Sequence, residues 1–130
     1  HLDWGQADLI SQDPVRLTDD YAPQPDVALV RRLGPAIPAA VDLLLAVEVS
    51  DTTLDHDLEE KRQRYVAAGI PAYWVADVVG RTLHLFADPQ DGDYLQREVV
   101  RDLDAVVPLP HCAAGSSFRP REIFLEAAPA

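Results

Sequence analysis

An apolar run between positions 41 and 49 constrains the fold of this chain more than any other segment. It reads Val-Asp-Leu-Leu-Leu-Ala-Val-Glu-Val. Long apolar runs of this kind are typical of strands that are covered on both faces of a sheet. Glu48 nevertheless lies near the end of the run, and an ionised carboxylate is costly to bury without a partner. The run therefore predicts a central strand at Val41–Val49 that carries an acid close to its end.

The pattern of the other segments predicts an α/β fold. After a breaker-rich start, which we expect to form an edge strand or loop over residues 1–25, apolar and alternating segments predict further strands. We expect them at Val27–Val30, Tyr73–Asp77, Thr82–Phe86, Tyr94–Val100 and near Val106–Leu109, with a polar turn at Asp88–Asp93. The order of elements suits a mixed β-sheet with one helix packed across a face.

One helix is expected between the two central strands. Thr52, Thr53 and Asp55 are suitable N-cap residues. The helix should end near Ala68, because Gly69 suits the left-handed C′ position and Pro71 follows it. The aromatic residues near its end and in the following strand are expected to pack in the core rather than to stack on bases. They are Tyr65, Tyr73 and Trp74.

Length and charge limit the classes of function. The 130 residues suggest a single domain over 1–130, and no apolar run is long enough to span a bilayer. The single cysteine, Cys112, fits a cytoplasmic protein. A formal net charge of −11 argues against a broad electrostatic grip on nucleic acid, so any contact with DNA should be weak or local.

Asp26 and Glu48 are the first candidate site residues. Asp26 follows Pro25 at the start of one strand, and Glu48 lies near the end of the next. Two converging carboxylates can hold a hard divalent cation. Two simpler alternatives stay open. Asp26 could be a turn acid, and Glu48 could pair with a buried lysine or arginine.

Asp57 and Lys61 are the next candidates, since a spacing of four residues places both on one helix face. By geometry alone, a surface ion pair is the favoured explanation of the two residues. Ser50 could hydrogen-bond at the site or simply end its strand, and Asp77 could be a turn acid.

A longer series of residues, from Pro25 to Asp77, resembles the Uma-two family. This is a large bacterial group of restriction-endonuclease-like proteins in the PD-(D/E)XK nuclease superfamily. The matching pieces are Pro25-Asp26-Val27, Glu48-Val49-Ser50-Asp51-Thr52-Thr53, Asp57, Lys61, Tyr65, Gly69-Ile70-Pro71-Ala72-Tyr73-Trp74 and Asp77. Serine stands at position 50, where the superfamily usually has lysine. The resemblance implies a restriction-endonuclease-like sheet, and an N-terminal helical segment that relatives usually carry would be missing here.

The resemblance also implies a mechanism. Asp26, Glu48 and the Val49 carbonyl would bind Mg²⁺ or Mn²⁺, and Lys61 would replace the lysine missing at Ser50. Asp26, Glu48 and Lys61 would then catalyse metal-dependent hydrolysis of DNA, with Asp57 and Ser50 in supporting contacts. The alternatives are a catalytically inactive binding or assembly module with the same fold, and a phosphodiesterase that acts on a small nucleotide. A homodimer is compatible with the nuclease interpretation.

Overall fold

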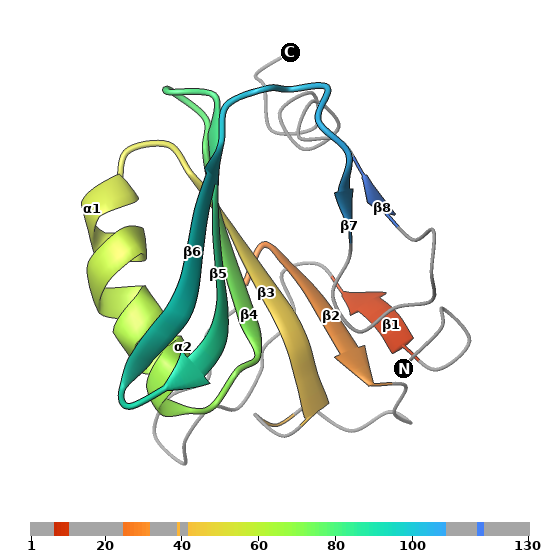
Figure 1. Ribbon diagram of the computed structural model, residues 1–130, viewed down its shortest axis with the longest axis vertical. Coiled ribbons are helices and arrows are strands. Elements are labelled where there is room, and N and C mark those ends of the chain that lie inside the picture. Colours follow the sequence, from red (N-terminus) through yellow and green to blue (C-terminus); the bar gives the residue numbers. More distant parts are fainter. Residues whose placement is uncertain (1–6, 11–24, 32–38, 40–41, 109–116, 119–130) are drawn as a thin grey trace.

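A six-stranded sheet forms the body of the protein (Figure 1). The computed structural model describes residues 7–10, 25–31, 39, 42–108 and 117–118. The strands lie side by side in chain order: β1 (Ala7–Ile10), β2 (Val27–Arg31), β3 (Leu43–Ser50), β4 (Ala72–Asp77), β5 (Thr82–Gln90) and β6 (Asp93–Val100). A separate two-stranded ribbon joins β7 (Val107–Pro108) to β8 (Ser117–Phe118).

Only the β3–β4 pair is parallel among the pairs of the six-stranded sheet. A parallel pair needs a long crossover connection, and here a helix supplies it. The helix has three segments, α1 (Leu54–His56), a π-helical turn (Asp57–Lys61) and α2 (Arg62–Ala67). The expected mixed α/β sheet with one helix across a face is therefore confirmed.

The two faces of the sheet are buried by different elements. The helix packs on one face, where its buried residues join a cluster that includes Ala46, Tyr73 and Phe86. Val107 of β7 joins a second cluster on the opposite face, together with Val47 and Trp74. Strand β3 is buried on both faces over most of its length, as its apolar sequence predicts.

The helix ends where the sequence predicts. Gly69 adopts a φ of 77°, and its N–H donates to the Val66 carbonyl. The Ile70 N–H donates to the Tyr65 carbonyl, so the two bonds form a Schellman motif. The start of the helix differs from the expected cap. Thr53 holds the N-cap position but makes no side-chain capping bond to the backbone.

Several boundaries depart from the sequence-based expectations. Strand β3 spans 43–50 rather than 41–49, and β5 continues to Gln90, so the polar turn expected over Asp88–Asp93 is much shorter. Asp91 and Gly92 both have positive φ, which lets a two-residue turn join β5 to β6. Strand β1 confirms the edge strand expected within residues 1–25, and β8 was not predicted because a two-residue strand has no periodicity.

We expect the core to respond to truncation far more at Leu83 than at Leu95. Leu83 is fully buried, whereas Leu95 on β6 is 67% exposed. Leu83→Ala should lower the free energy of unfolding by about 2–5 kcal/mol, because it leaves a cavity. The control Leu95→Ala should change it by less than about 0.5 kcal/mol. Urea unfolding of both variants measures this, and equal losses would contradict the assigned faces.

Candidate functional site

Asp26 and Glu48 lie next to each other on the helix-covered face of the sheet. Strands β2 and β3 pair antiparallel, with Val27 opposite Val47 and Ala28 opposite Ala46. One further step along this register places Asp26 opposite Glu48. Directly opposed residues share a face and have closely spaced Cβ atoms. The two acids expected to converge from the sequence are therefore brought together.

The backbone of Val49 lies beside these two acids. We call this place, where β2 begins and β3 ends, the corner. Its N–H donates to Asp26 Oδ2 over 2.7 Å. The N–H and C=O of one strand residue point to the same neighbouring strand, so the Val49 carbonyl also faces the Asp26 side. The next residue faces the other way, since the Ser50 carbonyl accepts from the Val78 N–H. Asp26, Glu48 and the Val49 carbonyl thus meet at the start of β2.

Both carboxylate oxygens of Glu48 have partners on the helix. Lys61 Nζ lies 3.4 Å from Oε2, and the Tyr65 hydroxyl donates to Oε1 over 3.3 Å. The Glu48 side chain is almost fully buried, while that of Lys61 is 28% exposed. The simpler alternative of a buried acid paired with a cation therefore describes part of what is seen. That pair alone does not explain why Asp26 and Asp57 also lie close to Glu48.

Asp57 is a second buried acid that shares the same lysine. Its Oδ1 lies 3.3 Å from Lys61 Nζ, and its Oδ2 accepts from the Thr53 hydroxyl over 2.9 Å. The Asp57 carbonyl accepts from the Tyr73 hydroxyl over 2.9 Å. The predicted pairing of Asp57 with Lys61 is therefore present, but it is largely buried rather than a surface ion pair.

The π-helical turn explains how three helix residues face one carboxylate. In an α-helix each residue advances by about 100°, so every step of four residues drifts by about 40° around the axis. The wider π turn, with bonds from i to i+5, drifts in the opposite sense. Asp57 to Lys61 crosses the π turn, and Lys61 to Tyr65 crosses α2. The two drifts offset each other, so all three side chains point toward β3.

Burial and neighbouring charge raise the pKa of Glu48 from its ordinary 4.5 to about 7. Desolvation is the largest cause, Lys61 opposes it, and the negative charges of Asp26 and Asp57 add to it. Glu48 and Asp57 therefore share the Lys61 ammonium group, and Asp26 adds a third carboxylate beside Glu48.

Lys61 stays protonated at this corner. Burial alone would lower the pKa of its ammonium group, but attraction by Glu48 and Asp57 outweighs this effect, and the pKa lies above its ordinary value. A lysine that acts as a general base needs a lowered pKa. The geometry therefore suits Lys61 to stabilise negative charge rather than to accept a proton.

Other polar residues near the site have contacts of their own. The Ser50 hydroxyl is buried on the Glu48 side of the sheet and has no hydrogen-bond partner among the described residues. Asp77 accepts from the Gly80 N–H, which makes it a turn acid. Arg64 is half exposed and pairs with Glu60. His111 and Cys112 lie outside the described residues.

A hard divalent cation fits this donor set. Carboxylate and carbonyl oxygens are the ligands that Mg²⁺ and Mn²⁺ prefer, and a cation would relieve the repulsion that raises the Glu48 pKa. The fit rests on two side chains, Asp26 and Glu48, and on the Val49 carbonyl. Within the described part of the chain, no group of three or more Asp, Glu, His or Cys side chains is arranged to hold a metal.

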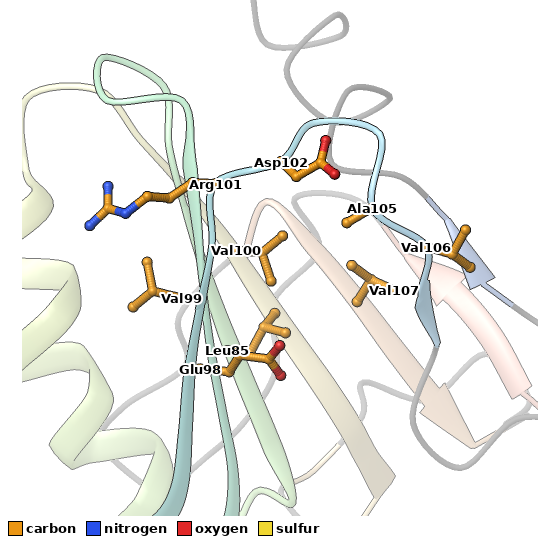
Figure 2. A pocket seen from close by; sticks show the side chains of 9 residues that line it. All are labelled: Leu85, Glu98, Val99, Val100, Arg101, Asp102, Ala105, Val106 and Val107. Carbon is orange, nitrogen blue, oxygen red and sulfur yellow. The ribbon is translucent and has the colours of Figure 1, made fainter.

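Hollows lined by described residues include one beside the start of the helix and one on the opposite face of the sheet. One, of about 420 Å³, is lined by residues 51–56, where the chain passes from β3 into the helix, and one of its lining residues, Thr53, donates a hydrogen bond to Asp57. The other, of about 310 Å³, lies on the opposite face, where Figure 2 shows Leu85, Val100 and Val107 between the sheet and β7. None of the predicted site residues lines the second hollow.

Sequence reasoning missed the polar role of two core tyrosines. Tyr65 and Tyr73 are fully buried and stack with ring centroids 4.8 Å apart, so their assignment to the core is confirmed. Their hydroxyl groups nevertheless end on Glu48 and on the Asp57 carbonyl. A buried tyrosine hydroxyl usually finds a partner, and that rule could have identified both.

Comparison with known proteins gives one family and one fold. A family model, Uma2, described as "Putative restriction endonuclease", matches residues 3–119. A solved structure from Anabaena variabilis, titled a "putative nuclease belonging to DUF820", superposes with a TM-score of 0.63 at 17% identity. The match covers 92% of this chain and 68% of that one. None of the curated proteins compared matches the sequence. No helix in the described ranges is long and apolar enough to cross a membrane.

We expect Glu48→Gln to stabilise the protein at high pH. The native pKa of about 7 exceeds the ordinary 4.5, so the native state holds an extra proton between these values. Stability is therefore highest below pH 4.5 and falls as the pH rises through 7, by about 3 kcal/mol in all. Glutamine carries no charge, so the variant should raise the thermal midpoint more at pH 8 than at pH 5.

The matched control is Glu98→Gln, which changes an exposed glutamate on β6. Its effect on the thermal midpoint should be small and the same at both pH values. Thermal unfolding followed by circular dichroism at pH 5 and pH 8 measures both variants. A pH-independent effect of Glu48→Gln would contradict the assigned burial of charge.

Proposed function

Because the chain belongs to the Uma2 family of restriction-endonuclease-like proteins, we propose that it is a metal-dependent endonuclease that hydrolyses phosphodiester bonds in DNA. The observation that carries the proposal is the corner where Asp26 opposes Glu48 and the Lys61 ammonium lies against Glu48. A cytoplasmic site of action follows from the proposal, since such an enzyme must meet DNA there.

Asp26, Glu48 and the Val49 carbonyl would bind Mg²⁺ or Mn²⁺. A hydrogen bond to Asp26 Oδ2 does not prevent this, because each carboxylate oxygen has more than one lone-pair direction. Once bound, the cation supplies polarisation of the scissile phosphate and a water of lowered pKa. The Tyr65 hydroxyl would hold Glu48 in the orientation that binding requires.

Lys61 would act on the phosphate rather than on the cation. Its ammonium group stays charged, and its exposed fraction allows it to reach a substrate oxygen. A fixed positive charge stabilises the negative charge that develops on a phosphoryl group in the transition state. Asp57 would keep Lys61 in place while the substrate enters.

The net charge of −11 shapes the expected mode of DNA binding. An acidic protein gains little from general attraction to phosphates. Arg62, one of the cations near the helix, already pairs with Glu59 and Asp93, and Arg64 pairs with Glu60. The contact with DNA would therefore be local, with the bound cation and Lys61 supplying most of the positive charge.

Calorimetric titration with Mn²⁺ tests the ligand set. The wild-type protein should bind Mn²⁺, and Asp26→Asn and Glu48→Gln should each weaken binding by more than about tenfold, because each removes a ligand charge. Asp91→Asn is the control, since it removes an acid from the exposed β5–β6 turn. Equal binding by all four proteins would place the cation elsewhere.

Lys61→Met separates stabilisation of the transition state from metal binding. We expect kcat for plasmid cleavage to fall about a hundred- to a thousandfold. The affinity for Mn²⁺ should be unchanged or tighter, because the variant removes a positive charge beside the ligands. Arg64→Met, on the exposed side of the same helix, is the control and should change neither value. A loss of Mn²⁺ binding in Lys61→Met would contradict the role given to this residue.

The rival function is a binding or assembly module that keeps the fold without catalysis. Serine at position 50 and the acidic net charge favour it. A folded wild-type protein that gives no heat with Mg²⁺ or Mn²⁺ would support this rival. Cleavage of a chromogenic phosphodiester, with plasmid DNA left intact, would instead indicate a small-nucleotide phosphodiesterase.

A further inference from the structure

Tyr73 contacts the helix at the one place where its geometry is unusual. The Tyr73 hydroxyl donates to the carbonyl of Asp57, the first residue of the π-helical turn. The described helix is α-helical on either side of this turn. π-helical turns are rare and are found frequently at functional sites, so a specific tether to one suggests a role beyond packing.

The π-helical turn sets where Lys61 points. It begins at Asp57 and ends at Lys61, so both residues that share the buried ion pair lie at its two ends. A change from π to α winding would rotate Lys61 about the helix axis relative to Asp57. The contacts of Lys61 with Glu48 at 3.4 Å and with Asp57 at 3.3 Å both depend on the present winding.

Tyr73 is itself held rigidly. It is fully buried on β4, its ring stacks on Tyr65 with an interplanar angle of 18°, and Phe86 lies on its other side with centroids 6.1 Å apart. β4 is the parallel neighbour of β3, with Val75 opposite Glu48. The hydroxyl therefore fixes the helix relative to the same part of the sheet that carries Glu48.

We propose that Tyr73 is a positioning residue, whose hydroxyl holds the π-helical turn and thereby keeps the Lys61 ammonium against Glu48. The Tyr73 hydroxyl donates to the backbone carbonyl of Asp57 and to neither the Glu48 nor the Asp57 carboxylate. Its effect on Lys61 therefore passes through the backbone of Asp57. Its consequence for catalysis rests on the proposed function. The effect of the hydroxyl on the position of Lys61 does not rest on the proposed function, and it can be measured without metal or substrate.

Tyr73→Phe removes only the hydroxyl and keeps the stacked ring. Tyr94→Phe is a closely matched control, because Tyr94 is also buried beside Phe86 and also donates to a backbone carbonyl, that of Ile70, over 2.9 Å. Ile70 follows the helix and lies outside the π-helical turn. Both variants lose one buried hydrogen bond, so thermal midpoints that fall by similar amounts would show that they are matched in stability.

Lys61 is the only lysine in the sequence, which gives a direct probe of its position. In metal-free protein labelled with ¹⁵N-lysine, an ammonium group held between two carboxylates exchanges slowly enough to give a resolved side-chain signal. We expect this signal in the wild type and in Tyr94→Phe. In Tyr73→Phe it should broaden or move to the position of free lysine. A signal unchanged in Tyr73→Phe would overturn the proposal.

Cleavage kinetics give the second readout. Tyr73→Phe should lower kcat about ten- to a hundredfold with KM nearly unchanged, as expected when a catalytic group is misplaced. Tyr94→Phe should keep wild-type kcat. If the wild type proves inactive, the lysine signal still decides the proposal.

The folded wild type provides a further test should Tyr73→Phe fail to fold. A Tyr73 hydroxyl proton that donates to Asp57 should exchange slowly and show nuclear Overhauser contacts to protons of Asp57 or Leu58. A rapidly exchanging hydroxyl without these contacts would overturn the proposal.

Discussion

The buried carboxylate of Glu48 is the constraint on which the rest of the site depends. β3 is central and its apolar residues bury both faces, so an acid there loses its hydration. Lys61 and Tyr65 each contact one oxygen, yet the pKa of Glu48 remains raised, chiefly because burial removes its hydration and further because Asp26 and Asp57 add negative charge. A purely structural ion pair would gain nothing from two further acids. Carboxylates that converge at a strand end are the oxygen donors that a hard cation binds.

The geometry of the helix allows two of its side chains to reach the Glu48 carboxylate. Lys61 and Tyr65, which differ in length and chemistry, must both reach the Glu48 carboxylate from the helix side of the sheet. The π-helical turn from Asp57 to Lys61 offsets the drift of α2 from Lys61 to Tyr65, and the Schellman motif at Gly69 returns the chain directly into β4. β4 then supplies Tyr73, which reaches back to the helix. The crossover that makes β3 and β4 parallel is thus also the element that completes the site.

The sequence predicts much of this arrangement and fails where local patterns carry no signal. The apolar run identifies β3, alternation places Glu48 and Ser50 together, and Gly69 marks the helix end. The π-helical turn could not be predicted, because spacing by four suits an α-helix equally well. Neither could the tyrosine hydroxyl contacts, since a buried aromatic residue satisfies the core pattern whether or not its polar end reaches a partner. Asp57 looked like a surface acid because its burial depends on tertiary packing.

The acidic net charge does not conflict with the proposed phosphate-cleaving site, because the net charge and the charges within the site act at different ranges. Beyond a Debye length of about 8 Å at physiological salt, the charges of exposed residues are largely screened. Within the corner, burial keeps Lys61 and the three carboxylates strongly coupled. A divalent cation adds two positive charges there without altering the rest of the surface. At the proposed site, local positive charge would therefore favour a phosphate even though the net charge of the whole chain does not. The acidic net charge would weaken the general affinity for DNA without preventing catalysis.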